Sequence, residues 1–140
     1  MELSDEKLTS YLKESHTIAV IGLSEKEEKT SHRVSAFMQA KGYKIIPINP
    51  KMAGQTILGQ RVYASLQEVE EPIDIVNIFR RSEFLPKIAE EFIQTDAKIF
   101  WAQLGIENEQ AAEILTQANR LDFVMDRCIK IEYQRLIEQP

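Results

Sequence analysis

The chain has 140 residues, of which 44% are hydrophobic and 28% charged, and its formal net charge is −5. This size and composition suit one soluble globular domain with its own core. The acidic balance argues against a nucleic-acid or membrane-surface partner, which needs an extended basic face. No apolar run approaches the roughly 18 residues of a membrane span, and no apolar leader opens the chain. We therefore expect a cytoplasmic protein.

Strands and helices alternate along the chain. The first helix lies within residues 1–15, begins after Ser4 as its N-cap, and packs Leu8, Tyr11 and Leu12 onto the domain. Apolar segments predict five strands, at residues 17–21, 43–48, 74–79, 98–102 and 122–125. Helices are expected at residues 30–40, from residue 82 onward, and at 107–119 and 129–137, whereas residues 51–69 are irregular. Thr30 or Ser31 is the expected cap of the second helix, and Ser82 that of the third.

This alternation is typical of β-α-β units with right-handed crossovers. It predicts an α/β fold, a single Rossmann-like domain over residues 1–140. The expected sheet is doubly wound, parallel and five-stranded, with strand order 3-2-1-4-5 and helices on both faces. In such sheets, ligands bind outside the carboxyl ends of the strands, near the switch point of the strand order. The residues that follow each strand are therefore the candidates for a site.

The loop after the first strand holds Gly22, Leu23 and Ser24 and resembles a phosphate-binding turn. A glycine allows a tight turn and close approach of a ligand, and the amides of the following helix can receive a phosphate. The nearby Lys26, Lys29, Ser31 and Arg33 could support an anion. The alternative is an ordinary turn with a solvated charged loop, which the acidic Glu25, Glu27 and Glu28 favour.

The second strand ends in Asn49, Pro50 and Lys51, without a carboxylate. A dinucleotide site of the NAD type uses an acidic residue there to bind the ribose hydroxyls, and it also needs further glycines after the first strand. Lys51 suits a phosphorylated ribose better. Taken alone, however, Lys51 is better interpreted as a surface lysine on a turn.

Phe79 ends the third strand and Arg80 and Arg81 follow it, while Trp101 and Gln103 lie at the end of the fourth. Paired arginines can bind phosphate, although a surface salt bridge or a subunit contact accounts for them equally well. The tryptophan could line a cleft, but core packing is the commoner role.

Cys128, the single cysteine, follows the fifth strand, and we expect a buried structural thiol rather than a reactive one. The sequence shows no metal-ligand spacing and no nucleophile–base pair, so no catalytic or metal-binding residue is predicted.

Taken in order, six segments resemble the small stand-alone CoA-binding proteins, which are similar to the N-terminal CoA-binding domain of the succinyl-CoA synthetase alpha subunit. The segments are VIGLS, GYKIIPINPK, ILGQRVYASLQEV, VNIFRR, IFWAQLGIENEQA and VMDRCIKIEY. The resemblance covers about residues 8–136.

The resemblance implies coenzyme A as the ligand. Its phosphates would lie at the loop after the first strand, the adenosine and 3′-phosphate at the turn 49–51, and the pantetheine at Phe79, Arg80, Trp101 and Gln103. The synthetase continues into a second domain with a phosphorylated histidine, and neither His16 nor His32 matches that histidine. The resemblance thus implies a CoA or acyl-CoA binder that is not itself an enzyme.

Three other functions stay open at this point, one of them a thiol-regulated protein that uses Cys128. An NADP-linked oxidoreductase-like domain could use Lys51 and Arg80 for a 2′-phosphate, although the glycine fingerprint and a proton donor are missing. A non-catalytic subunit could work with a separate catalytic partner. Tyr133 and Leu136 on the last helix could serve a homodimer, or they could pack on the sheet.

Overall fold

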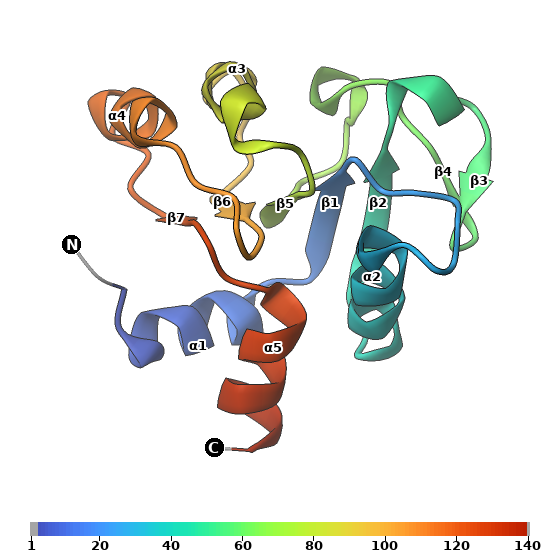
Figure 1. Ribbon diagram of the computed structural model, residues 1–140, viewed down its shortest axis with the longest axis horizontal. Coiled ribbons are helices and arrows are strands. Elements are labelled where there is room, and N and C mark those ends of the chain that lie inside the picture. Colours follow the sequence, from blue (N-terminus) through green and yellow to red (C-terminus); the bar gives the residue numbers. More distant parts are fainter. Residues whose placement is uncertain (1–2, 140) are drawn as a thin grey trace.

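Five parallel strands form the central sheet of the structure, a computed structural model that describes residues 3–139 (Figure 1). The spatial order is β2-β1-β5-β6-β7. The strands are β1 (Thr17–Ile21), β2 (Lys44–Ile48), β5 (Ile75–Ile78), β6 (Ile99–Ala102) and β7 (Phe123–Val124). Nearly every residue of the inner strands is buried, as expected for a parallel sheet covered on both faces. The α/β, doubly wound architecture predicted from the sequence is thus confirmed, while residues 1, 2 and 140 of the predicted domain lie outside the described part.

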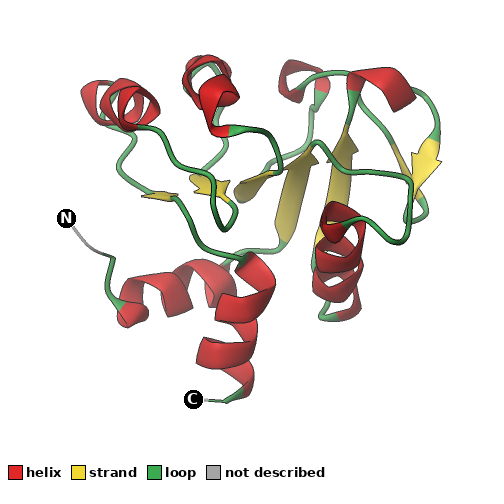
Figure 2. Ribbon diagram, in the orientation of Figure 1, coloured by secondary structure: helices red, strands yellow, loops and turns green. Residues whose placement is uncertain are grey.

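Helices cover both faces of this sheet (Figure 2). One layer contains α1 (Asp5–Glu14), α2 (Thr30–Ala40) and α5 (Ile129–Tyr133), which continues as a π-helical segment, Gln134–Glu138. The other layer contains α3 (Leu85–Phe92) and α4 (Glu109–Gln117). Because successive strand residues point to opposite faces, the sheet divides its apolar side chains between two cores.

The strand order differs from the predicted 3-2-1-4-5. The third strand, β5, pairs with β1 rather than with the outer edge of β2. Tyr63 occupies the carboxyl end of that edge: its N–H donates to the Pro47 carbonyl (3.0 Å), and its own carbonyl accepts from the Asn49 N–H (2.9 Å). The residues before it form a hairpin of β3 (Thr56–Ile57) and β4 (Gln60–Arg61). Both orders bury the same apolar strands, so the sequence pattern could not distinguish them.

Helix starts also depart in part from the sequence analysis. Ser4 caps α1 as expected, because its side chain accepts from the Lys7 N–H. The N-cap of α2 is Lys29, which makes no side-chain cap, rather than Thr30 or Ser31. Ser82 opens a 3₁₀ turn, Ser82–Phe84, and its hydroxyl accepts from the Glu107 N–H instead of capping α3.

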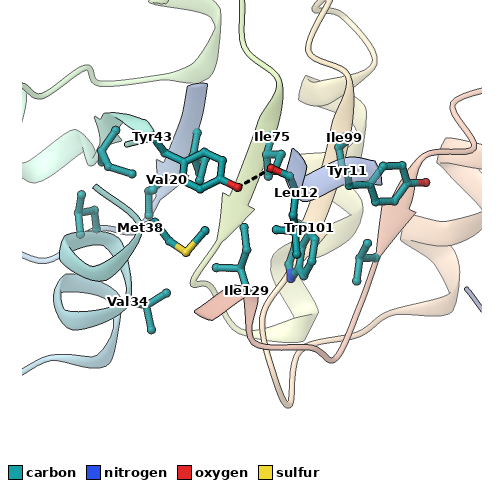
Figure 3. Packing of buried hydrophobic residues seen from close by; sticks show 14 of the residues in the cluster. Tyr11, Leu12, Val20, Val34, Met38, Tyr43, Ile75, Ile99, Trp101 and Ile129 are labelled. Carbon is teal, nitrogen blue, oxygen red and sulfur yellow. Dashed lines mark hydrogen bonds between the residues drawn. The ribbon is translucent and has the colours of Figure 1, made fainter. Parts of the chain in front are cut away.

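Figure 3 shows the core between the sheet and the helices α1, α2 and α5. Trp101 lies at its centre, fully buried, and its indole N–H donates to the Arg127 carbonyl at 2.8 Å. The Tyr43 hydroxyl donates to the Leu12 carbonyl and joins α1 to the start of β2.

No helix among residues 3–139 is long and apolar enough to cross a membrane.

Charged side chains tie the N-terminal helix to the C-terminal one. Glu132 is buried and accepts from Arg127 (2.5 Å) and from Arg135 Nε (2.8 Å). Arg135 also forms a bidentate salt bridge with the Asp5 carboxylate, in which both N···O distances are 2.9 Å. Burial opposes ionisation of Glu132, but the bonds from Arg135 and Arg127 outweigh it and hold the pKa of this carboxyl below its ordinary range.

The Ser35 hydroxyl on α2 is buried without a hydrogen-bond partner, the one such side-chain atom in the part of the chain that is described. We expect Ser35→Ala to raise the free energy of unfolding by about 1 kcal/mol, because it removes an unpaired polar atom and favours the helix. Urea denaturation measures this change. The control is Ser31→Ala one turn earlier, which removes a paired hydroxyl and should destabilise. A loss of stability in Ser35→Ala would contradict the expectation.

Candidate functional site

The carboxyl ends of β1 and β5 meet at a close contact of two backbones. Gly22 follows β1 with φ +85°, and a Cβ added there would fall inside the van der Waals distance of the Phe79 carbonyl oxygen. From this point one loop runs to α2 on one face, while the other runs to α3 on the opposite face. Such a divergence creates the crevice in which doubly wound sheets bind ligands. The observed strand order therefore places the switch point between Gly22 and Phe79.

Side chains of α2 hold the loop after β1 in place through hydrogen bonds. The Ser24 N–H donates to Ser31 Oγ (3.0 Å), and the Ser24 carbonyl lies 2.8 Å from His32 Nδ1. The Ser24 hydroxyl accepts from the Lys26 N–H (3.1 Å). Ser31 is thus a buried positioning residue. His32, which the sequence analysis did not assign to the site, is half-buried and likewise holds this loop in place.

The start of α2 is open to an anion. Its N-cap, Lys29, makes no side-chain cap, and its first turn contains no acidic residue. An uncapped helix start presents backbone N–H groups and the positive end of the helix dipole. The Arg33 guanidinium reaches back to the Glu28 carbonyl and to Thr30 Oγ1, so it orders the exposed loop before the helix.

The acidic residues of this loop do not neutralise its cations. Glu25, Glu27 and Glu28 are exposed, and within residues 3–139 none of them forms a salt bridge. Lys29 and Lys51 are likewise exposed and have no ion-pair partner there. The cations therefore remain available to an anionic ligand.

Asn49 connects the turn after β2 to the loop after β1. Its Nδ2 donates to the Leu23 carbonyl (3.0 Å), and its Oδ1 accepts from the Lys51 N–H (3.0 Å). Pro50 and Lys51, both exposed, begin a 3₁₀ turn, Pro50–Met52. The structure thus brings the first two predicted loops together, with Asn49 as the link.

A pocket of about 310 Å³ lies beside this turn, on the α3 face of the sheet. Ile21, Ile48 and Ile88 contribute apolar surface to it, whereas Arg80 and Lys87 contribute positive charge. Its remaining lining residues are Pro50, Ala64, Ser65, Leu66, Phe84 and Glu91. This combination suits a flat apolar group that carries an anion.

Phe84 and Lys87 were missed by the sequence analysis. The Arg80 guanidinium stacks over the Phe84 ring with its carbon 4.5 Å from the ring centroid, and 37% of Phe84 is exposed. The sequence signal that could have indicated this side of the pocket is an aromatic residue four positions after Arg80, within one helical turn of it.

Other predicted residues lie apart from this pocket. Arg81 has an 82% exposed side chain and pairs loosely with Glu83 at 3.8 Å. Trp101 is a core residue with no exposed surface, which fits the packing alternative. Gln103 is buried, and its Nε2 donates to Asn77 Oδ1 at 2.6 Å. Cys128, expected to be buried, is half-buried at the start of α5.

A family model described as "CoA binding domain" matches residues 16–134. The uncharacterised protein YneT of Bacillus subtilis is 48% identical over 130 residues, which are 93% of this chain and 94% of YneT. The alpha subunit of ADP-forming acetate–CoA ligase I from Pyrococcus furiosus is 29% identical over 114 residues, 74% of this chain and 25% of that subunit.

Among solved structures, cell-free ID.343 from Thermus thermophilus superposes with a TM-score of 0.91 and 31% identity, covering 96% of this chain and all of that one. The match to the family model includes all five strands of the sheet and the turns at their carboxyl ends. The resemblance found in the sequence is thus confirmed, and the chain belongs to the CoA-binding domain family.

Proposed function

We propose that the protein binds coenzyme A or an acyl-CoA at the carboxyl edge of β1, β2 and β5, in the cytoplasm, without catalysis of its own. The observation that carries this proposal is the family match, which spans every loop of that edge. The diphosphate would occupy the loop after β1 and the uncapped start of α2. The adenosine would enter the pocket beside Pro50.

The charges at this edge support the proposal. CoA carries a diphosphate and a 3′-phosphate, and Lys29, Lys51, Arg80 and Lys87 surround the places where these would lie. The end of β2 has no carboxylate. A carboxylate at this place would repel a phosphorylated ribose. The side chains at the edge contribute cations, amides and apolar surface, which bind and position a ligand.

Calorimetric titration with CoA, acetyl-CoA, NADP and ATP tests the proposal. We expect CoA to bind most tightly, and an Arg33→Ala/Lys51→Ala variant to lose about 10- to 100-fold in CoA affinity. The matched control is Lys44→Ala/Lys98→Ala, which removes two cations next to the amino ends of β2 and β6. It should bind CoA like the wild type. Tighter binding of NADP than of CoA, or no CoA binding at millimolar concentration, would refute the proposal.

A subunit role is the second candidate. It is favoured by the Pyrococcus furiosus relative, whose name identifies it as the alpha subunit of a ligase. In that role the protein would present CoA to a catalytic partner chain. Purification from the native cell tests this: a second polypeptide in equal amount supports the role, and a single polypeptide argues against it.

A further inference from the structure

A pocket of about 270 Å³ lies at the amino ends of β1 and β2. Its walls come from the end of α1, from the residues between α2 and β2, and from the C-terminal helix. In Figure 1, α1 ends near the tail of the β1 arrow, whereas the loop that begins with Gly22 leaves the head of that arrow. The pocket shares no lining residue with the carboxyl edge at which CoA is proposed to bind. We call it the amino-end pocket.

Two tyrosine rings and two aliphatic side chains give the amino-end pocket apolar surface. Tyr43 is 8% exposed and Tyr133 is half-buried, and their ring centroids are 6.1 Å apart with the rings nearly perpendicular. Leu12 and Ile137 add to this surface. The Tyr43 hydroxyl is already paired, because it donates to the Leu12 carbonyl. Since an apolar cavity of about 150 Å³ can hold benzene, the amino-end pocket has room for a ring that carries one substituent.

A hydroxyl in this lining has no hydrogen-bond partner among residues 3–139. Ser15, the C-cap of α1, is only 6% exposed, and its Oγ takes part in no hydrogen bond within that range. Ser35 Oγ is the one unpaired side-chain polar atom there that is fully shielded. The Ser15 hydroxyl therefore keeps some exposed surface and opens into the pocket that Ser15 lines. It can donate one hydrogen bond and accept two.

Three basic side chains line the amino-end pocket, and none of its lining residues is acidic. They belong to Lys13, His16 and Lys41. The Lys41 ammonium is already balanced by Glu138 at 2.6 Å. Lys13 is exposed in the last turn of α1 and forms no ion pair within residues 3–139. A cation suits the negative end of the helix dipole, and this long-range attraction leaves the Lys13 ammonium free to bond a ligand.

An ammonium and an unpaired hydroxyl beside apolar surface complement a carboxylate on an apolar body. The carboxylate accepts a charge-assisted hydrogen bond from the ammonium and another from the hydroxyl. We propose that the amino-end pocket binds a small monocarboxylate with an apolar body. Its carboxylate contacts Lys13 and Ser15, and its body lies against the rings of Tyr43 and Tyr133. This inference does not depend on CoA binding, so failure of either proposal leaves the other standing.

Titration of the protein with benzoate, followed by NMR of the backbone N–H groups, tests the inference. Gly42 lines the amino-end pocket, whereas Gly22 lies at the other end of β1. We expect the Gly42 signal to shift saturably with a Kd of about 1 mM or lower, and the Gly22 signal to stay in place. Benzamide, an uncharged analogue of the same shape, should bind about tenfold more weakly.

Two variants test the named contacts. Lys13→Ala should weaken benzoate binding about fivefold, and Ser15→Ala about tenfold, because each removes one donor to the carboxylate. The matched control is Lys7→Ala, which removes a cation from the same helix. Lys7 pairs with Asp122 outside the pocket, so this variant should bind benzoate like the wild type.

The inference is overturned if the wild type shows no saturable Gly42 shift, or if benzamide binds as tightly as benzoate. An equal shift of the Gly22 signal would place benzoate at the carboxyl edge and overturn it as well. So would wild-type affinity in Lys13→Ala or in Ser15→Ala, each judged folded from the same spectra. Should Ser15→Ala not fold, Lys13→Ala decides the question, because Lys13 is exposed and lies outside the core.

Discussion

Replacement of Gly22 by alanine should destabilise the protein strongly. At φ +85° an L side chain is strained, and the new Cβ would press on the Phe79 carbonyl oxygen while lying 3.2 Å from its carbon. Phe79 cannot retreat freely, because its N–H donates to the Ile21 carbonyl at 2.9 Å. We expect the free energy of unfolding to fall by about 2 to 5 kcal/mol, the sum of the backbone strain and the overpacking. Urea denaturation measures the loss.

Gly54→Ala is the matched control. Gly54 has the same φ of +85°, but nothing lies within 4 Å of its added Cβ. It should therefore lose only about 1 kcal/mol from the backbone strain. Equal losses in the two variants would show that the contact between the ends of β1 and β5 is not as close as described. In variant protein that remains folded, CoA affinity should also fall for Gly22→Ala, since the loop after β1 begins there.

Glu132→Gln should cause the second large loss of stability. The neutral amide cannot balance the two guanidinium groups of Arg127 and Arg135 that now bond the buried carboxylate. We expect a loss of about 2 kcal/mol in the free energy of unfolding at pH 7, smaller than for a fully buried ion pair because both arginines are partly exposed. Glu138→Gln, which breaks the more exposed pair with Lys41, should cost much less.

The same carboxylate makes the wild type sensitive to acid. The folded-state pKa of Glu132 lies below its ordinary value of 4.5, so its contribution to stability is complete above that pH. The contribution is lost as the pH falls from about 4.5 through the lowered folded-state pKa. Denaturation curves at a series of pH values should show a smaller acid-induced loss in Glu132→Gln than in the wild type. Parallel losses would mean that other carboxylates dominate.

Much of the candidate site could be predicted because strand ends are visible in a sequence. Apolar runs end at Ile21, Ile48 and Phe79, and the residues that follow them do meet at one edge of the sheet. What each side chain does there could not be predicted. Ser31 and Asn49 bond to the loop after β1, because the buried loop amides and carbonyls need partners that only the folded chain brings near.

Asn77 shows the same limit from inside a strand. In the sequence it is one polar residue in an apolar run, and only the pairing of β5 with β6 brings Gln103 to it. Trp101 shows the converse. Its position at a strand end left open whether it lines a cleft or packs in the core, and the alternation of side chains along β6 turns it into the core under α5.

The sequence by itself determined the class of fold, the five strands, the loops at the carboxyl edge and the family, because apolar periodicity and glycine positions are local properties of the chain. The tertiary structure alone decided that β5 lies beside β1, which moved the switch point to Gly22 and Phe79. Both strand orders bury the same side chains. The choice depends on long-range contacts, above all on Tyr63 occupying the carboxyl end of the outer edge of β2, which no local pattern encodes.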